Sequence, residues 1–255
     1  LMALAPAVAP ALGGIMLLYL PWSSIFFFLA LYGGSVTLLV YRYLGETLPE
    51  QQSLHPAKIG RNYAELLVNR YFISVSVASS LIYGGLLVYL SSSSVVFIRM
   101  CGVPAEYYGL FFIGSVIGCI RGSALGARLS RRLPSELVML TGVKLAVASC
   151  ATMWLAHFLW PDNISALILP MVTYSAALGL VLPHAMAIAL RPFAHIAGTA
   201  SSLFGFVQMT LSAAATAIMG NFLVNSPIPM IQAMLIITLV ALALTARVDR
   251  LSRSL

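Results

Sequence analysis

Charged residues are scarce in this chain: only 8% of its 255 residues are charged, whereas 60% are hydrophobic. Soluble globular domains carry roughly 25% charged residues, so this composition excludes an ordinary soluble protein. Seven acidic residues stand against 14 lysines and arginines, a net charge of +7. Such an excess also occurs in nucleic-acid-binding proteins, but basic loops that face anionic lipid explain it here. We expect a lipid bilayer as partner and no nucleic acid.

Cysteine is also scarce, and the common catalytic motifs are missing. The three cysteines cannot form a complete disulfide framework, and Cys119 and Cys150 lie in apolar stretches, where they are expected to pack as small residues. The four histidines lack metal-binding spacing, and neither a phosphate-binding glycine loop with a lysine nor a pair of carboxylates occurs. The sequence therefore predicts a protein that is not an enzyme and holds no metal or cofactor.

Long apolar stretches fill the rest of the chain, and each is near the ~20 residues that cross a bilayer as a helix. Backbone groups in lipid must bond within their own segment, which favours an all-α polytopic membrane protein. We predict eight transmembrane helices, at 1–20, 22–41, 71–94, 107–127, 137–158, 164–190, 197–223 and 230–246. The first of them lacks the basic region of a signal peptide, and the chain starts inside it without a methionine, so we expect a fragment.

The loops between these stretches alternate between basic and nearly uncharged. One side carries almost all of the basic loop residues, whereas the other side holds Arg99 alone. The positive-inside rule makes the basic side cytoplasmic and predicts a cytoplasmic C-terminus. The basic loop residues are Arg42, Lys58, Arg61, Arg70, Arg128, Arg131, Arg132, Arg191, Arg247, Arg250 and Arg253.

The expected organisation follows from the longest polar stretch. We predict two helices of one bundle at 1–44, a cytoplasmic linker at 45–70, a six-helix bundle at 71–248 and a cytoplasmic tail at 249–255. Within the linker, Ile59, Tyr63, Leu66 and Leu67 lie near one face of a short helix, which is typical either of a helix on the membrane surface or of a solvated linker helix.

Glycines recur every fourth residue in the fourth stretch, at Gly114, Gly118, Gly122 and Gly126. They share one helix face, where small residues let a neighbouring helix approach closely. This pattern predicts tight helix packing. Static packing and sliding during a conformational change remain equally open.

Polar groups inside the stretches are few, and none of the acidic residues lies deep in a span. Any carboxylate that couples transport to an ion gradient must then lie outside this chain, or the protein is not ion-coupled. Arg121 and Lys144 lie about two turns from the basic ends of their helices, where they either reach the interface or line a cavity. His184 follows Pro183 and is either a structural, hydrogen-bonded histidine or a proton relay.

A mid-membrane ligand cavity would be lined by aromatic and amide groups. Gln208 is the best candidate, because an amide in an apolar helix needs a partner. The other candidates are open to a packing or interface role as well. They are Tyr83, Tyr89, Tyr174, Phe204 and Phe206.

Several motifs resemble the major facilitator superfamily, in particular its drug:proton antiporters of the bicyclomycin and chloramphenicol resistance type (Bcr/CflA). The residues from Ala5 to Gly14 resemble the antiporter signature of the fifth helix, with Ala9 in place of a glycine. Trp22 to Phe26 and Glu46 to Pro49 are similar to the two ends of the sixth helix. Gly122 to Leu133 resembles the loop after the eighth helix, and Gly198 to Gln208 resembles the eleventh.

The resemblance runs through helices five to twelve of a twelve-helix, two-bundle exporter with alternating access. It implies that Pro10, Gly13 and Gly14 form the antiporter motif between the bundles. The proton-coupling acid of the family lies in a first helix that this chain does not include. We expect Arg121, Arg128, Arg131 and Arg132 to hold a cytoplasmic gate.

The sequence thus predicts a monomeric, multi-pass protein of the bacterial inner membrane that exports lipophilic drugs or small metabolites in exchange for protons. Two alternatives remain open. One is a narrow exporter of sugars or amino acids, for which more buried polar groups are expected. The other is a membrane remnant or scaffold that does not transport.

Overall fold

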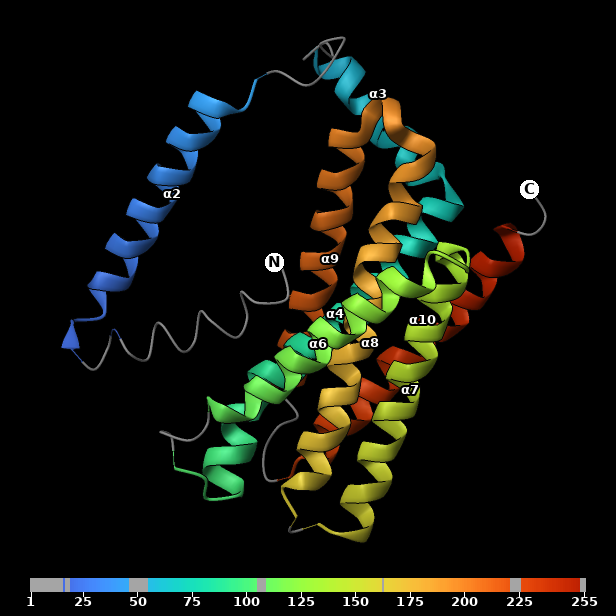
Figure 1. Cartoon of the computed structure of the whole chain (residues 1–255). Coiled ribbons are helices and arrows are strands. Elements are labelled where there is room, and N and C mark those ends of the chain that lie inside the picture. Colours follow the sequence, from blue (N-terminus) through green and yellow to red (C-terminus); the bar gives the residue numbers. More distant parts are fainter. Residues whose placement is uncertain are drawn as a thin grey trace. The chain divides into compact units, whose positions relative to one another are not determined.

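Every regular element in the described part of the computed structural model is helical (Figure 1). The structure describes residues 16, 19–45, 55–104, 109–161, 163–220 and 226–252, and it contains no strand within these ranges. The predicted all-α fold is thereby confirmed. The elements are α2 (Ser23–Tyr43), α3 (Pro56–Val68), α4 (Arg70–Ser94), η1 (Val95–Met100), α6 (Leu110–Leu129), α7 (Ser135–Leu159), α8 (Ser165–Leu190), η2 (Arg191–Ile196), α9 (Ala197–Gly220) and α10 (Ile228–Ser252).

Seven of the eight predicted membrane stretches are helices in this part of the chain. Six helical runs are long and apolar enough to cross a membrane, and one of them, Ser165–Gly220, has 56 residues. At about 1.5 Å per residue this run is nearly three times as long as a ~30 Å bilayer. Its backbone leaves helical geometry at Phe193 (φ −115°, ψ 32°), directly after Pro192, so the run folds back as two spans, α8 and α9. The first predicted stretch lies almost wholly outside the described residues.

The helix ends agree with the predicted stretches to within a few residues for most spans. The prediction of 71–94 corresponds to α4, which begins at Arg70 and ends at Ser94. The largest difference is at α10, which continues to Ser252 and so into the predicted tail. A helix can extend beyond the apolar core because arginine and leucine are both good helix formers.

The chain divides into two compact units, Leu1–Lys58 and Ile59–Leu255. The first contains α2. The second contains α4 to α10 and most of α3, so the predicted linker helix belongs largely to the C-terminal unit. Leu66 is fully buried in the core of this unit, and the Tyr63 hydroxyl lies 3.1 Å from Ser202 Oγ on α9. The linker helix is therefore docked on the bundle through Tyr63 and Leu66, whereas Leu67 is exposed and does not share this contact.

The glycine row of α6 packs against α8, as its spacing predicts. A Cβ added at Gly118 or Gly122 would overlap the backbone of Val172 or Ala176, respectively. At Gly114 the nearest atom would be a methyl group of Val172, at 3.0 Å. The two backbones are thus close enough that only glycine fits in the middle of this contact.

One of the two prolines within α8, Pro183, leaves a carbonyl group that a serine hydroxyl approaches. Pro183 has no N–H to donate to the carbonyl of Gly179, one turn earlier. The Ser123 hydroxyl of α6 donates to this carbonyl over 3.4 Å, and Gly179 itself contacts the α6 backbone at Cys119. Near the other end of α8, Ser149 of α7 donates to the carbonyl of Pro170. Side chains of the neighbouring helices therefore hold α8 at both prolines.

The C-terminal unit is a bundle with one continuous core. Helix α8 packs between α6 and α7, and α4 packs against α8, α9 and α10 (Figure 1). The helix ends that adjoin the predicted basic loops lie at one end of this bundle, which we call the basic end. It comprises the start of α4, the turn between α6 and α7, the end of α8 and the end of α10. Its basic residues are Arg70, Arg128, Arg131, Arg132, Arg191 and Arg247.

Candidate functional site

Tyr89 and Tyr174 lie in the packed core of the bundle. Tyr174 is fully buried, and its hydroxyl donates to the carbonyl of Ile82 on α4 over 2.6 Å. Its ring occupies the space that a side chain at Gly85 would fill. Tyr89 packs edge-on against Phe97 with ring centroids 6.2 Å apart. The sequence left core packing open as an alternative to ligand binding for both tyrosines. The structure places both of them in the packed core.

Among the candidates on α4 and α9, Tyr83 and Gln208 remain half-buried, whereas Phe204 is buried and Phe206 is exposed. Gln208 begins a row of polar side chains along α9 that continues one and two turns later with Ser212 and Thr216. The Ser212 and Thr216 hydroxyls are buried without a hydrogen-bond partner within the described structure. We call these three residues the α9 polar row.

The α9 polar row lies at the contact with α4. A Cβ at Gly84 of α4 would lie 3.5 Å from the Cα of Ser212, so the two helices meet closely at this level. Beside this contact, the Gln208 amide has no hydrogen-bond partner among the described residues. An amide offers two donors and an acceptor. Gln208 is thus an accessible polar group within this apolar bundle.

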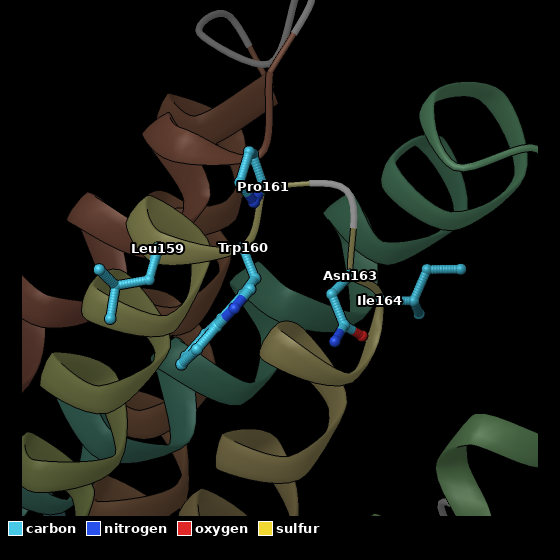
Figure 2. A pocket seen from close by; sticks show the side chains of 5 residues that line it. All are labelled: Leu159, Trp160, Pro161, Asn163 and Ile164. Carbon is cyan, nitrogen blue, oxygen red and sulfur yellow. The ribbon is translucent and has the colours of Figure 1, made fainter.

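A hollow with a volume of about 580 Å³ lies at the opposite end of the bundle from the basic end (Figure 2). Figure 2 shows its lining side chains on the turn that joins α7 to α8. They are Leu159, Trp160, Pro161, Asn163 and Ile164. None of the predicted substrate-binding residues lines it, and its tryptophan is typical of a membrane–water interface. It is therefore separate from the mid-membrane site predicted from the sequence.

The four predicted gate arginines are exposed. None of Arg121, Arg128, Arg131 and Arg132 makes an ion pair within the described ranges. Lys144 is exposed on α7 as well. The antiporter motif at Pro10, Gly13 and Gly14 lies outside the described residues.

An ion pair that the sequence did not predict joins three helix ends at the basic end. The Glu136 carboxylate, at the start of α7, accepts a hydrogen bond of 3.2 Å from Arg191, which follows α8. The same oxygen accepts one of 3.1 Å from the Tyr71 hydroxyl at the start of α4. An acidic residue in the first turn of a helix is also favoured by the helix dipole. The position of Glu136 in a first helical turn was the only sign of this ion pair in the sequence. Its partners, Tyr71 and Arg191, are 65 and 55 residues away along the chain.

His184 is buried and links α8 to the end of α6. Its Nδ1 atom lies 2.6 Å from the carbonyl oxygen of Leu180, and its Nε2 atom lies 2.5 Å from Ser130 Oγ. This agrees with a hydrogen-bonded histidine at a helix end, one of the two alternatives from the sequence. In the described ranges, no three His, Cys, Asp or Glu side chains come together as a metal site.

Comparison with known proteins identifies the fold as that of a transporter family. The model of the Major Facilitator Superfamily matches residues 1–217. A bicyclomycin resistance protein homolog of Haemophilus influenzae is 28% identical over 89% of this chain and 58% of its own length. An uncharacterized MFS-type transporter, YdgK of Bacillus subtilis, is 28% identical over 86% of this chain and 55% of its own length.

The multidrug resistance protein MdtL of Vibrio parahaemolyticus is 30% identical over 82% of this chain and 52% of its own length. The chain thus spans a little over half the length of these relatives. The family match covers most of the chain and agrees with a helical bundle whose helices are long and apolar enough to span a membrane. The chain is a multi-pass membrane protein of the Major Facilitator Superfamily.

Proposed function

We propose that this chain is the C-terminal part of an exporter that moves lipophilic drugs or small metabolites out of the cell in exchange for protons. The observation that carries the proposal is the family match together with two relatives named for resistance to bicyclomycin and to multiple drugs. The composition supports it, since an apolar bundle with few polar groups suits apolar ligands.

The proposed transport cycle is alternating access, in which the substrate site opens first to one side of the membrane and then to the other. The basic end faces the cytoplasm, because arginine and lysine are concentrated in cytoplasmic loops. This orientation also places the C-terminus in the cytoplasm, and the membrane is the bacterial inner membrane. The protein works as a monomer, with Arg121, Arg128, Arg131 and Arg132 at the cytoplasmic gate.

Dye efflux from cells that carry the full-length gene tests this proposal. We expect cells with the gene to expel a lipophilic cationic dye, and a protonophore to abolish the difference from cells without it. Protein level in the membrane is measured in parallel. Efflux that survives loss of the proton gradient would contradict proton coupling, and absence of efflux of any lipophilic dye would favour a narrow metabolite exporter or a chain that does not transport.

Gln208 is the residue of the C-terminal bundle that we assign to substrate binding. Replacing it with alanine is expected to raise the KM for export about three- to tenfold for substrates with a hydrogen-bonding group, since one neutral hydrogen bond contributes ~1 kcal/mol. Stability should change little, because the amide makes no hydrogen bond within the described structure. The matched control is Gln232→Ala, which removes an exposed amide from α10. Unchanged export of every substrate by Gln208→Ala would exclude this assignment.

A further inference from the structure

The linker helix α3 has one face on the bundle and another that the described residues leave uncovered. On the first face, Leu66 is fully buried, and Asn62 and Tyr63, one turn earlier, are half-buried. Leu67 and Val68 point elsewhere, and their side chains are 57% and 81% exposed. Helix α3 therefore keeps apolar surface uncovered beside its contact with the bundle.

The uncovered face combines apolar side chains with a cation. Arg61, Ala64 and Val68 are spaced by three and four residues, so they follow one another along one side of the helix. Leu67 lies beside this row, and all four residues are exposed. We call these four residues the outer face of α3. Large apolar side chains next to a basic residue are typical of a helix that lies in a membrane interface.

The outer face lies where a membrane span begins. Helix α4 starts at Arg70, two residues after Val68, and the helical run Arg70–Met100 is long and apolar enough to cross a membrane. The chain bends between the two helices at Asn69, whose backbone is extended and whose side chain accepts a hydrogen bond of 2.9 Å from the Phe72 N–H. Because a membrane helix ends near the membrane surface, the outer face of α3 starts at that surface.

Two side-chain contacts fix α3 at this end of the bundle. The Tyr63 hydroxyl lies 3.1 Å from Ser202 Oγ in the second turn of α9. The Glu65 carboxylate lies 3.6 Å from the His195 imidazole in η2. Figure 1 shows α3 at the same end of the C-terminal unit as the turn from α8 to α9. The helix is thus held near the starts of the spans rather than extended into water.

The cations at the outer face have no acidic partner in the described part of the chain. Arg61 and Arg70 are exposed, and neither makes an ion pair within the described ranges. Glu65 lies about 200° around the helix from Leu67 and faces His195 instead. The outer face therefore carries positive charge without a protein counterion, and the phosphate of an anionic lipid complements it.

We propose that the outer face of α3 docks on anionic phospholipid at the membrane surface. Leu67 and Val68 enter the layer between headgroups and acyl chains, and Arg61 and Arg70 bind lipid phosphate. The planar guanidinium suits phosphate because it donates two parallel hydrogen bonds. The lipid thereby holds the helix in which the chain passes from one compact unit to the other. The inference rests on the membrane location of the bundle and is independent of export and its direction.

The reactivity of cysteines at two positions of α3 tests the docking. Full-length Leu67→Cys and Glu65→Cys proteins are placed in nanodiscs of phosphatidylcholine, with or without phosphatidylglycerol, so that both membrane surfaces are open to solution. A charged maleimide that does not cross membranes modifies the thiols. Mass spectrometry reads each position separately, and every rate is divided by the rate in denatured protein. With phosphatidylglycerol, we expect position 67 to react about tenfold more slowly than position 65, as for burial of roughly half a leucine side chain.

Arg61→Gln separates the contribution of anionic lipid from that of apolar contact. One arginine near an anionic surface changes binding about fivefold, so the protection of position 67 should fall about fivefold in Leu67→Cys/Arg61→Gln with phosphatidylglycerol. In phosphatidylcholine alone, Arg61→Gln should leave the rate unchanged. The matched control is Arg132→Gln, which removes an exposed arginine of the basic end outside α3 and should not alter the protection. These positions are exposed, so the substitutions remove no core contact.

Three results would overturn the inference. Equal rates at positions 65 and 67 in both kinds of nanodisc would place the outer face in water. Protection that is the same in both kinds and unaffected by Arg61→Gln would mean that apolar contact alone, or another protein segment, covers Leu67. Protection that appears only with two protein copies in each nanodisc would assign the face to a second copy. Transport is not measured, so failure of the proposed export would leave each of these results unchanged.

Discussion

Replacing Gly122 with alanine is expected to destabilise the bundle by about 3 kcal/mol, at the upper end of the usual cost of overpacking. A Cβ at this position would lie 2.7 Å from the carbonyl carbon and 2.8 Å from the Cα of Ala176. Backbone atoms cannot turn aside as a flexible side chain can, so α6 and α8 must move apart. The displacement would also weaken the Ser123 and His184 hydrogen bonds, which cross the same interface.

Thermal unfolding of the purified full-length protein in detergent measures this effect. Two controls separate overpacking from the change of residue type. Gly114→Ala lies on the same face of α6 but meets only a methyl group of Val172, so its cost should be clearly smaller. Gly205→Ala meets nothing within 4 Å and should be neutral or slightly stabilising. Equal melting temperatures for Gly122→Ala and Gly205→Ala would show that α6 and α8 are not in backbone contact.

Replacing Arg191 with alanine is expected to cost about 2 kcal/mol, because it leaves the Glu136 carboxylate at a largely buried position without its cation. The Glu136 side chain is only 10% exposed, whereas that of Arg191 is 60% exposed. The loss of stability therefore comes mainly from the buried charge of Glu136. Because the guanidinium is exposed to solvent, this loss is smaller than that for a fully buried ion pair. Among the described side chains, the Tyr71 hydroxyl remains as a hydrogen-bond donor to Glu136.

A double-mutant cycle distinguishes this account from a general effect of removing an arginine. Glutamine at position 136 carries no charge and can still accept from Tyr71, so Arg191→Ala should cost less in a Glu136→Gln background than in the native one. Arg132→Ala serves as the control, because Arg132 is exposed and makes no ion pair within the described ranges. An equal cost of Arg191→Ala in both backgrounds would mean that the pair contributes nothing to stability.

The spans could be predicted from the sequence because the bilayer sets both their length and their composition. The predicted 71–94 and 164–190 lie within one residue of α4 and α8. The row of four glycines also predicted a close helix contact, which Gly118 and Gly122 make. The row of glycines did not predict which helix is the partner, because α7 separates α6 from α8 in the sequence.

Pairs of polar groups that are far apart in the chain could not be predicted from the sequence. Glu136 and Arg191 are 55 residues apart, and Ser130 and His184 are 54 apart, so no local spacing links them. Tyr174 was a candidate for ligand binding because an aromatic residue in a span has the same sequence pattern whether it faces a ligand or the core. Its contacts with Ile82 and Gly85 place it in the core. Gln208 stayed a candidate because it combines a polar group that has no partner among the described residues with a half-buried position.

The central claim is that the full-length protein uses a proton gradient to move a lipophilic substrate. The most direct test uses purified protein in liposomes, with an imposed pH gradient as the sole energy source and a fluorescent lipophilic dye outside. We predict that dye accumulates in liposomes with an acidic interior while protons leave, and that a protonophore prevents both. Equal dye uptake with and without the gradient, by protein shown to be folded and inserted, would contradict the account.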